Sequence, residues 1–175
     1  MDHQAFAQLL GNYGEFVGAI AVVITLGYLA VQIRQGTTTT RAVARQTLID
    51  GWAATQGQFQ TNPELLRIYA KGITQWSAMS NTEKTQFDVG MAAFLGNIQN
   101  GIHLHEARML DQETLDTIAG FMVACIRCEG GEQWWQETGF VTPQIREYLE
   151  NQLKVGDGIT AMELAPHWMA MANEE

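Results

Sequence analysis

Two cysteines lie three residues apart, as Cys125-Ile126-Arg127-Cys128, which is the spacing of thioredoxin-type redox motifs. In such motifs the first cysteine lies at the N-terminus of a helix, where the helix dipole stabilises the thiolate. Here we expect both cysteines near the C-terminal end of a helix, because Gly130-Gly131 follows as a stop signal. The sequence therefore predicts two buried, reduced thiols that serve as small apolar side chains.

His103 and His105 are further residues of metal-binding type. If two antiparallel helices meet at a turn near residue 110, His105 and Cys125 are offset by about ten residues, or ~15 Å along the axis. Zinc ligands must lie within a few ångströms of one another, so we predict no zinc site. His105 lies on an apolar stripe, where we expect a hydrogen-bonded core histidine. We predict no cofactor, and His105 is the only candidate ligand if the protein binds one.

Catalytic motifs are absent from the sequence. His103 and Glu106 are the one acid-base pair that a membrane-bound enzyme could use. Di-iron bundles need paired Glu-x-x-His motifs, and that order of residues does not occur here. The chain also has no P-loop, dinucleotide fingerprint, G-x-S-x-G or H-E-x-x-H motif. We therefore predict that the protein is not an enzyme.

An uncharged apolar run, FVGAIAVVITLGYLAVQI, extends from Phe16 to Ile33. As a helix its length is about 27 Å, close to the ~30 Å of a hydrocarbon core. The alternative is a buried helix of a soluble bundle. Asp2 and Glu15 precede the run without any Lys or Arg, which argues against a cleaved signal peptide. We predict one membrane span at about residues 16–33.

The charged residues predict the orientation of this span. Arg34, Arg41 and Arg45 follow the run, and by the positive-inside rule they hold the C-terminal side in the cytoplasm. From Gln46 onward the chain has seven basic and seventeen acidic residues. The net charge of −9 argues against nucleic acid as a partner, because binding to phosphates needs clustered Lys and Arg.

Two helical stripes are predicted to make contacts. Small residues recur at spacings of four, three and four along the run, which allows close packing of two helices in a membrane; they are Gly14, Gly18, Ala21 and Thr25. A second stripe continues toward Gln60 and comprises Ala44, Leu48, Trp52, Thr55 and Phe59. Between the stripes, Gly36 and the threonines 37–40 leave open whether one helix is continuous.

The rest of the sequence shows helical periodicity and no strand pattern. We expect helices that begin at a capping box (Ser80-x-x-Glu83), at Asp111 and at Pro143. The predicted fold is all-α: an N-terminal transmembrane helix, separate from or continuous with a long helix, and then a small helical bundle. The predicted parts are an anchor (1–35), a juxtamembrane helix (36–60), a bundle (61–155) and a Met-rich C-terminal tail (156–175).

Several segments resemble a widespread set of uncharacterised bacterial proteins that have one N-terminal span and a helical cytoplasmic body. The resemblance is carried by GAIAVVITLGYLAVQIRQ, by Asn62-Pro63-Glu64-Leu65, by EARMLD (106–111) and by GGEQWWQETGFVTPQIREYLE (130–150). This chain departs from the set at Gly101-Ile102-His103-Leu104-His105, where an aromatic-rich stretch is usual. The resemblance supports this topology and the all-helical fold, with the predicted span in a bacterial inner membrane, and it transfers no functional residue.

These observations favour a membrane-anchored, non-catalytic interaction or scaffold protein. It would associate with itself as a homo-oligomer, or serve as an accessory subunit of a larger inner-membrane complex. The alternative is a membrane-tethered sensor or carrier that binds a small apolar ligand or haem in the helical bundle. Aromatic and Met-rich segments, Trp134-Trp135 and the tail, are expected to pack in the chain's own core.

Overall fold

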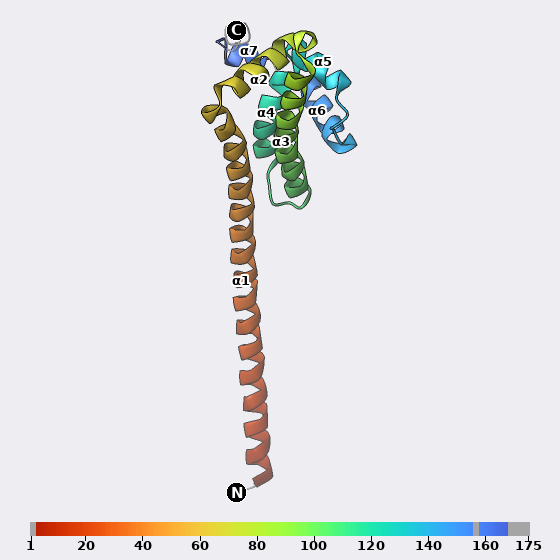
Figure 1. Ribbon diagram of the computed structural model, residues 1–175. Coiled ribbons are helices and arrows are strands. Elements are labelled where there is room, and N and C mark those ends of the chain that lie inside the picture. Colours follow the sequence, from red (N-terminus) through yellow and green to blue (C-terminus); the bar gives the residue numbers. More distant parts are fainter. Residues whose placement is uncertain (1–2, 156–157, 168–175) are drawn as a thin grey trace. The chain divides into compact units, whose positions relative to one another are not determined.

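The computed structural model describes residues 3–155 and 158–167, with side chains from residue 13 onward except residue 164. The residues described with their side chains are 86% helical and contain no strand, which confirms the all-α prediction (Figure 1). The helices are α1 (His3–Thr61), α2 (Pro63–Gln75), α3 (Asn81–Glu106), α4 (Gln112–Ile126), α5 (Glu129–Glu137), α6 (Pro143–Val155) and α7 (Ala161–Leu164), with a 3-10 turn at Trp76–Ala78.

The chain forms two compact units, Met1–Val43 and Ala44–Glu175, and the boundary between them falls inside α1. Gly36 and the four threonines do not interrupt this helix. Each threonine hydroxyl of residues 37–40 donates to the carbonyl oxygen four residues earlier, at 2.9–3.1 Å. These bonds satisfy the hydroxyls within the helix, so the polar stretch is compatible with continuous helical structure.

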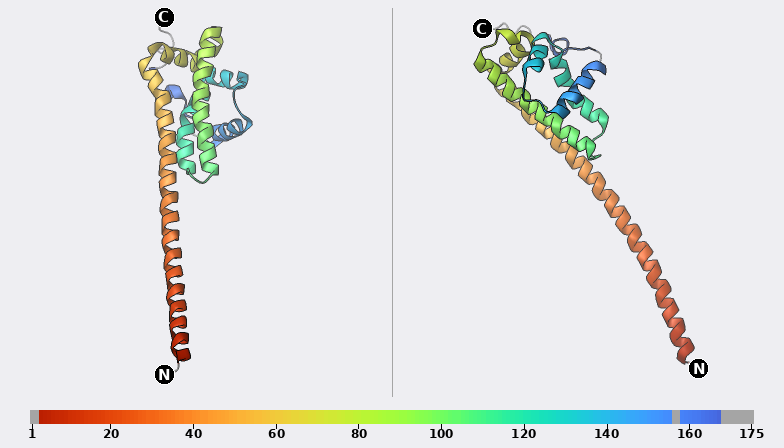
Figure 2. Two further views of the ribbon diagram at one scale, coloured as in Figure 1. Left: turned by 60° about the horizontal axis from the view of Figure 1, so that its bottom comes forward. Right: turned by 90° about the vertical axis from the view of Figure 1, so that its right-hand side faces the viewer.

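The second unit has its hydrophobic core between the helices of residues 44–164. The helices α3 and α4 lie side by side and antiparallel (Figure 2), α2 packs against α5 and α3, and α6 packs against α4. The largest fully buried side chains are Trp134, Phe87 and Phe94. As expected, Trp134 and Trp135 are core residues, with 0% and 6% of their surface exposed.

The helix starts follow the local capping signals. The Asn62 side chain accepts the N–H of Leu65 ahead of α2, whose first residue is Pro63. Ser80 and Glu83 form the predicted capping box at α3, and Asp111 caps α4. These signals involve residues at most three positions apart, so the sequence is sufficient to locate them.

Gly130 and Gly131 do not end a helix, contrary to the prediction. Helix α4 ends earlier, at Ile126, and both glycines lie within α5. A Cβ on Gly130 would collide with the carbonyl oxygen of Gly72 and lie 2.8 Å from the carbonyl carbon of Ile73. A Cβ on Gly131 would collide with the carbonyl oxygen of Cys125. The glycines therefore permit two backbone segments to approach closely. In the sequence, a glycine needed for close approach looks the same as a glycine that ends a helix.

Replacing Gly130 by alanine is expected to lower the free energy of unfolding by about 1–3 kcal/mol, because the new methyl group meets rigid backbone. Gly96 is the matched control within a helix, since its Cβ would meet nothing within 4 Å. Gly96→Ala is expected to stabilise the protein by ~0.5–1 kcal/mol through helix propensity. Thermal melts of the two variants in detergent measure the difference. Equal melts would contradict the close-approach role of Gly130.

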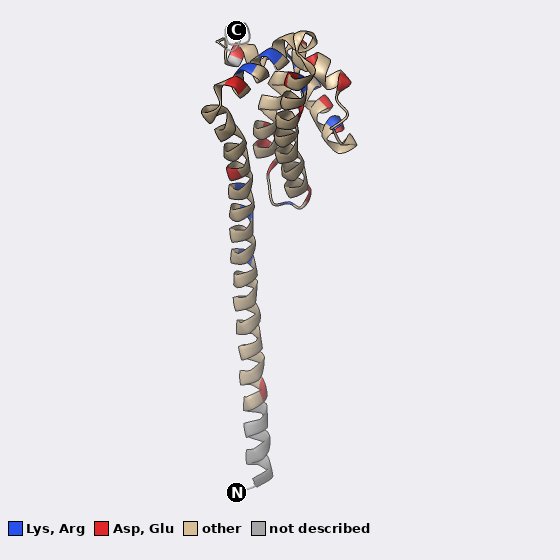
Figure 3. Cartoon of the chain, in the orientation of Figure 1, with Lys and Arg blue, Asp and Glu red and all other residues tan. Residues whose placement is uncertain are grey.

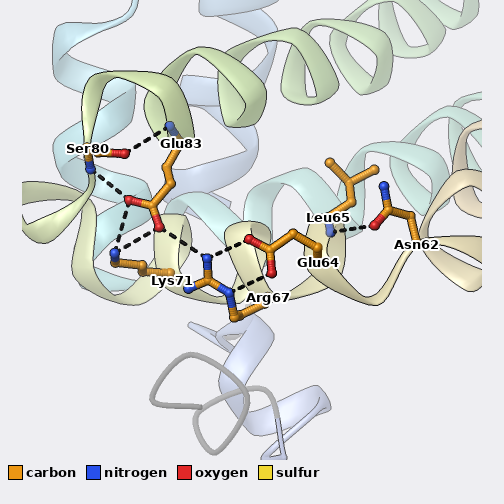
Figure 4. A network of polar contacts seen from close by, with 7 residues as sticks. All are labelled: Asn62, Glu64, Leu65, Arg67, Lys71, Ser80 and Glu83. Carbon is orange, nitrogen blue, oxygen red and sulfur yellow. Dashed lines mark hydrogen bonds and ion pairs between the residues drawn. The ribbon is translucent and has the colours of Figure 1, made fainter. Parts of the chain in front are cut away.

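A polar network joins α2 to the start of α3 (Figure 4). The Glu83 carboxylate accepts the backbone N–H of Ser80 at 2.8 Å, and it pairs with Lys71 at 2.9 Å and with Arg67 at 3.3 Å. The Ser80 N–H, and next the Lys71 ammonium, lower the pKa of Glu83 to about 2. The ionised carboxylate therefore holds together two helices that are separated by a turn.

Because the pKa of Glu83 is lower in the folded than in the unfolded state, its stabilising effect is present above the ordinary pKa of 4.5 and is lost as the pH falls toward about 2. Glu83→Gln keeps the capping box and removes the charge. We expect this variant to be less stable than the wild type at pH 7, by about 1–2 kcal/mol. The difference should vanish near pH 2 in melts at a series of pH values. Glu147→Gln, on an exposed part of α6, is the control and should show neither effect.

Candidate functional site

The part of α1 between Glu15 and Arg34 carries no charge (Figure 3). Its large apolar side chains are all exposed, with exposed fractions from 44% at Ile20 to 70% at Ile33. A soluble monomer rarely exposes so large a contiguous apolar surface. The helix is long and apolar enough to cross a membrane.

Thr25, Tyr28 and Gln32, which carry the polar side-chain groups of this stretch, form hydrogen bonds within the helix. The Thr25 hydroxyl donates to the carbonyl oxygen of Ala21 at 2.8 Å. The Gln32 amide donates to the hydroxyl of Tyr28 at 2.7 Å. Each of these bonds pairs a polar group within the helix, which lowers the cost of placing that group in hydrocarbon.

The predicted small-residue face is open in the single chain. A Cβ on Gly14 or Gly18 would meet nothing within 4 Å, and Ala21 and Thr25 are exposed. Two helices could approach closely along this face. Its role as an interaction face stays a prediction.

The predicted juxtamembrane stripe lies against the chain's own core. Leu48 is 1% exposed and Thr55 is 9% exposed, and Ala44 is half-buried. Trp52 packs edge-on against Phe94, with ring centroids 5.2 Å apart, and Phe59 packs against Tyr69 and Phe94. The stripe is thus not a free surface for a partner. Periodicity identifies a buried face, but it does not identify what buries it.

The two cysteines are buried, and both thiols are free. Cys125 lies in the last turn of α4, as expected, whereas Cys128 lies at the N-cap of α5 and not at a helix C-terminus. Burial raises the pKa of both thiols above the ordinary value. The Cys128 thiol donates to the carbonyl oxygen of Ala124 at 3.5 Å. This environment disfavours the reactive thiolate, which agrees with the expected packing role.

The histidines are not brought together with the cysteines. His105 is half-buried, and its Nδ1 lies 3.1 Å from the carbonyl oxygen of Leu110. Leu110 lies beyond the end of α3, whose last residue is Glu106. His103 is exposed and lies 2.9 Å from the amide of Gln99. In the described part of the chain, no three His, Cys, Asp or Glu residues are placed to hold a metal ion.

The predicted acid-base pair takes part in a surface hydrogen-bond chain that joins α3 to α6. Gln99 contacts His103 and donates to Gln144 at 2.8 Å, and Gln144 donates to Glu106 at 2.7 Å. His103 and Glu106 are thus each paired with a glutamine. These contacts link two helices, so a packing role accounts for them.

The Met-rich tail is described only in part. Ala161 of α7 is buried in the core, and Met162 packs against it. These residues follow the expectation that the tail packs on the bundle. Trp168, Met169 and Met171 lie outside the described residues.

A cavity of about 360 Å³ opens between four helices of the second unit. We call it the aromatic groove. Its lining comprises Gln56, Phe59 and Gln60 from α1, Leu66 and Tyr69 from α2, Phe94 from α3 and Phe121 from α4. The sequence placed Phe59 and Phe94 on inward-facing stripes, but it contains no signal for an unfilled space between helices. His105, the predicted ligand residue, does not line the groove.

No protein-family model matches the chain, and no curated protein or solved structure matches it.

Proposed function

We propose that the chain is a single-pass protein of a bacterial inner membrane, with its span at about residues 16–33. The observation that carries this proposal is the continuous exposure of apolar side chains from Phe16 to Ile33. In water such a surface favours aggregation, whereas in hydrocarbon the same side chains are solvated. The helical length of about 27 Å fits a bilayer core.

The second unit would then lie in the cytoplasm. Arg34, Arg41 and Arg45 follow the span directly, and Glu15 precedes it. This distribution favours a cytoplasmic C-terminal side. The excess of acidic residues after Gln46 disfavours contact with anionic headgroups, so the body would be free to meet protein partners.

The proposed role is non-catalytic association, either with a second copy or as an accessory subunit of a membrane complex. The support is twofold. First, the small-residue face of α1 is open. Second, the groups whose pKa is strongly shifted have structural roles: the Glu83 carboxylate is in a helix cap and ion pairs, and the Cys125 thiol is packed in the core.

Extraction of native membranes with alkaline carbonate tests the anchor. We expect the full chain to stay in the pellet, and protease added to inverted membrane vesicles to digest the second unit. Protease added to the outside of spheroplasts should leave that unit intact. Release by carbonate would overturn the proposal, and digestion from the outside would overturn its orientation.

Gly18→Leu is expected to weaken self-association in membranes at least about tenfold, because the larger side chain separates the two helices. Gly27→Leu is the matched control. Gly27 lies nine residues further on, two and a half helical turns away, on the opposite side of α1, and a Cβ there also meets nothing within 4 Å. Cross-linking in native membranes measures the dimer fraction. Equal loss in both variants, or no dimer in the wild type, would contradict self-association through this face.

A further inference from the structure

We propose that the second units of two copies pair through an exposed stripe of α1, with the two helices parallel and in register. We call this surface the outer stripe, and its residues are Gln46, Ile49, Ala53, Gln56 and Gln60. The proposal rests on the proposed self-association, and it adds a second contact surface outside the predicted span. All five residues belong to the second unit.

The outer stripe has the spacing of a coiled-coil seam. Its residues recur at intervals of three, four, three and four, so they occupy the a and d positions of a heptad labelled a to g. All five are exposed, and 46% of the Ile49 surface is open. Leu48 and Thr55, which are buried in the core, both occupy position c. A second helix can therefore lie along the outer stripe without displacing the core-facing side of α1.

Two hollows between α1 and α4 border the outer stripe. The first has a volume of about 400 Å³, and its lining includes Ile49 of α1 and Ile118 of α4. The second is the aromatic groove, which Gln56 and Gln60 line from the side of α1. Helices pack when the side-chain ridges of one fit into the grooves of another. A helix laid along the outer stripe would therefore lie over the edges of both hollows and contact α4 as well.

Charge complementarity selects a second copy as the partner and sets its orientation. Arg45 and Asp50 are the only charged residues of α1 within the second unit, and they flank the outer stripe at positions g and e. In a parallel pair, a residue at g faces the residue at e five positions later on the other helix. Arg45 of each copy therefore faces Asp50 of the other, which gives two ion pairs. In an antiparallel pair g faces g, so the two arginines would repel each other.

Both charges are available for this pairing. Arg45 and Asp50 are exposed, and neither takes part in the ion pairs found among the described residues. Asp111 and Glu113 line the same hollow as Arg45, and Asp111 already caps α4. Asp50 accepts the Gln46 amide through its Oδ1 at 2.8 Å. An ionised carboxylate has about four acceptor sites, so Asp50 can also accept from an arginine.

The outer stripe is too small to form a stable dimer by itself in solution. Residues 46–60 span only about 22 Å of helix, and a standard interface buries ~800 Å² on each partner. Contact through the span would remove this obstacle, because it makes the pairing of the second units intramolecular and raises their effective concentration. Anchors in one membrane also give both copies the same direction. We therefore expect the contact in membranes.

Disulfide cross-linking of the full chain in native membranes tests the register. Gln46→Cys, Ala53→Cys and Gln60→Cys each place a thiol at position a, where equivalent residues of a parallel pair face each other. We expect all three variants to form disulfide-linked dimers under mild oxidation. Ala54→Cys is the matched control, because Ala54 is also an exposed alanine but occupies position b, away from the seam. Both native cysteines are buried, so the wild type gives the background.

The contrary results are distinct. A disulfide at only one of the three positions would overturn the parallel register, because an antiparallel crossing brings at most one residue to its equivalent. Equal yields at Ala53→Cys and Ala54→Cys would overturn the contact, because they indicate random collision. If a general cross-linker gives a wild-type dimer but the outer stripe gives no disulfide, this proposal is wrong and the proposed self-association is unaffected. If neither method gives a dimer, both proposals are wrong.

Charge exchange in the Ala53→Cys variant tests the ion pairs. Arg45→Asp should lower the yield of disulfide-linked dimer about fivefold, because it replaces two attractions by two repulsions. Adding Asp50→Arg places opposite charges across the seam again and should restore the yield. A role of Arg45 within its own chain would not give this rescue. An unchanged yield in the single exchange, or no rescue in the double exchange, would overturn the pairing of Arg45 with Asp50.

Discussion

Replacing Ile24 and Leu26 together by arginine is expected to abolish membrane integration. Both residues lie near the middle of the apolar run, with 66% and 60% of their surface exposed. An arginine at the centre of a span costs ~2.5–3.5 kcal/mol on insertion scales, so the pair costs about 5–7 kcal/mol. The run is only 18 residues long and has little surplus apolar length to offset this cost. Carbonate extraction should find the variant in the soluble or degraded fraction.

The matched control places the same two charges outside the run. Thr38→Arg with Thr40→Arg changes exposed positions of the same helix, on the side where arginines already follow the span. This variant should remain in the pellet. If the variant at Ile24 and Leu26 also remained there in full, the apolar run would not be the anchor.

Trp134→Ala is expected to give the largest loss of stability in the second unit. The indole is fully buried, lies edge-on to Phe87 with centroids 5.6 Å apart, and donates to the Asp88 carboxylate at 2.8 Å. Truncation of a buried tryptophan costs ~3–5 kcal/mol through lost burial and the cavity left behind. For a unit of this size we expect a melting temperature roughly 10–20 °C lower.

Two further variants separate the loss of core packing from the loss of the hydrogen bond to Asp88. Trp134→Phe retains most of the packing and removes the bond to Asp88, so its loss should be about 1–3 kcal/mol. Phe140→Ala removes an aromatic ring that is 65% exposed and should change stability by less than ~0.5 kcal/mol. Near-ultraviolet circular dichroism of the full chain in detergent follows the melts. A Trp134→Ala melt equal to that of Phe140→Ala would show that this core does not stabilise the unit.

The groove and the anchor differ in how far the sequence could predict them. The proposed anchor depends on the composition of one continuous apolar segment, so the sequence alone is sufficient to locate that segment. The groove depends on where four helices leave a space, and its lining residues are up to 65 positions apart, from Gln56 to Phe121. Without the relative placement of α1, α2, α3 and α4, no local pattern distinguishes Phe121 from any other half-buried aromatic residue.

The sequence by itself determined the elements that depend on neighbours in the chain: the apolar run, the capping box of Ser80 and Glu83, the cap at Asp111 and the all-α class. Only the tertiary structure decided which faces meet. It placed Gly130 against Gly72, turned the stripe of Leu48 and Phe59 into the core, and placed Cys128 at a helix start. The physical reason is range: caps and apolar length act over a few residues, whereas close packing is decided between segments that are distant in sequence.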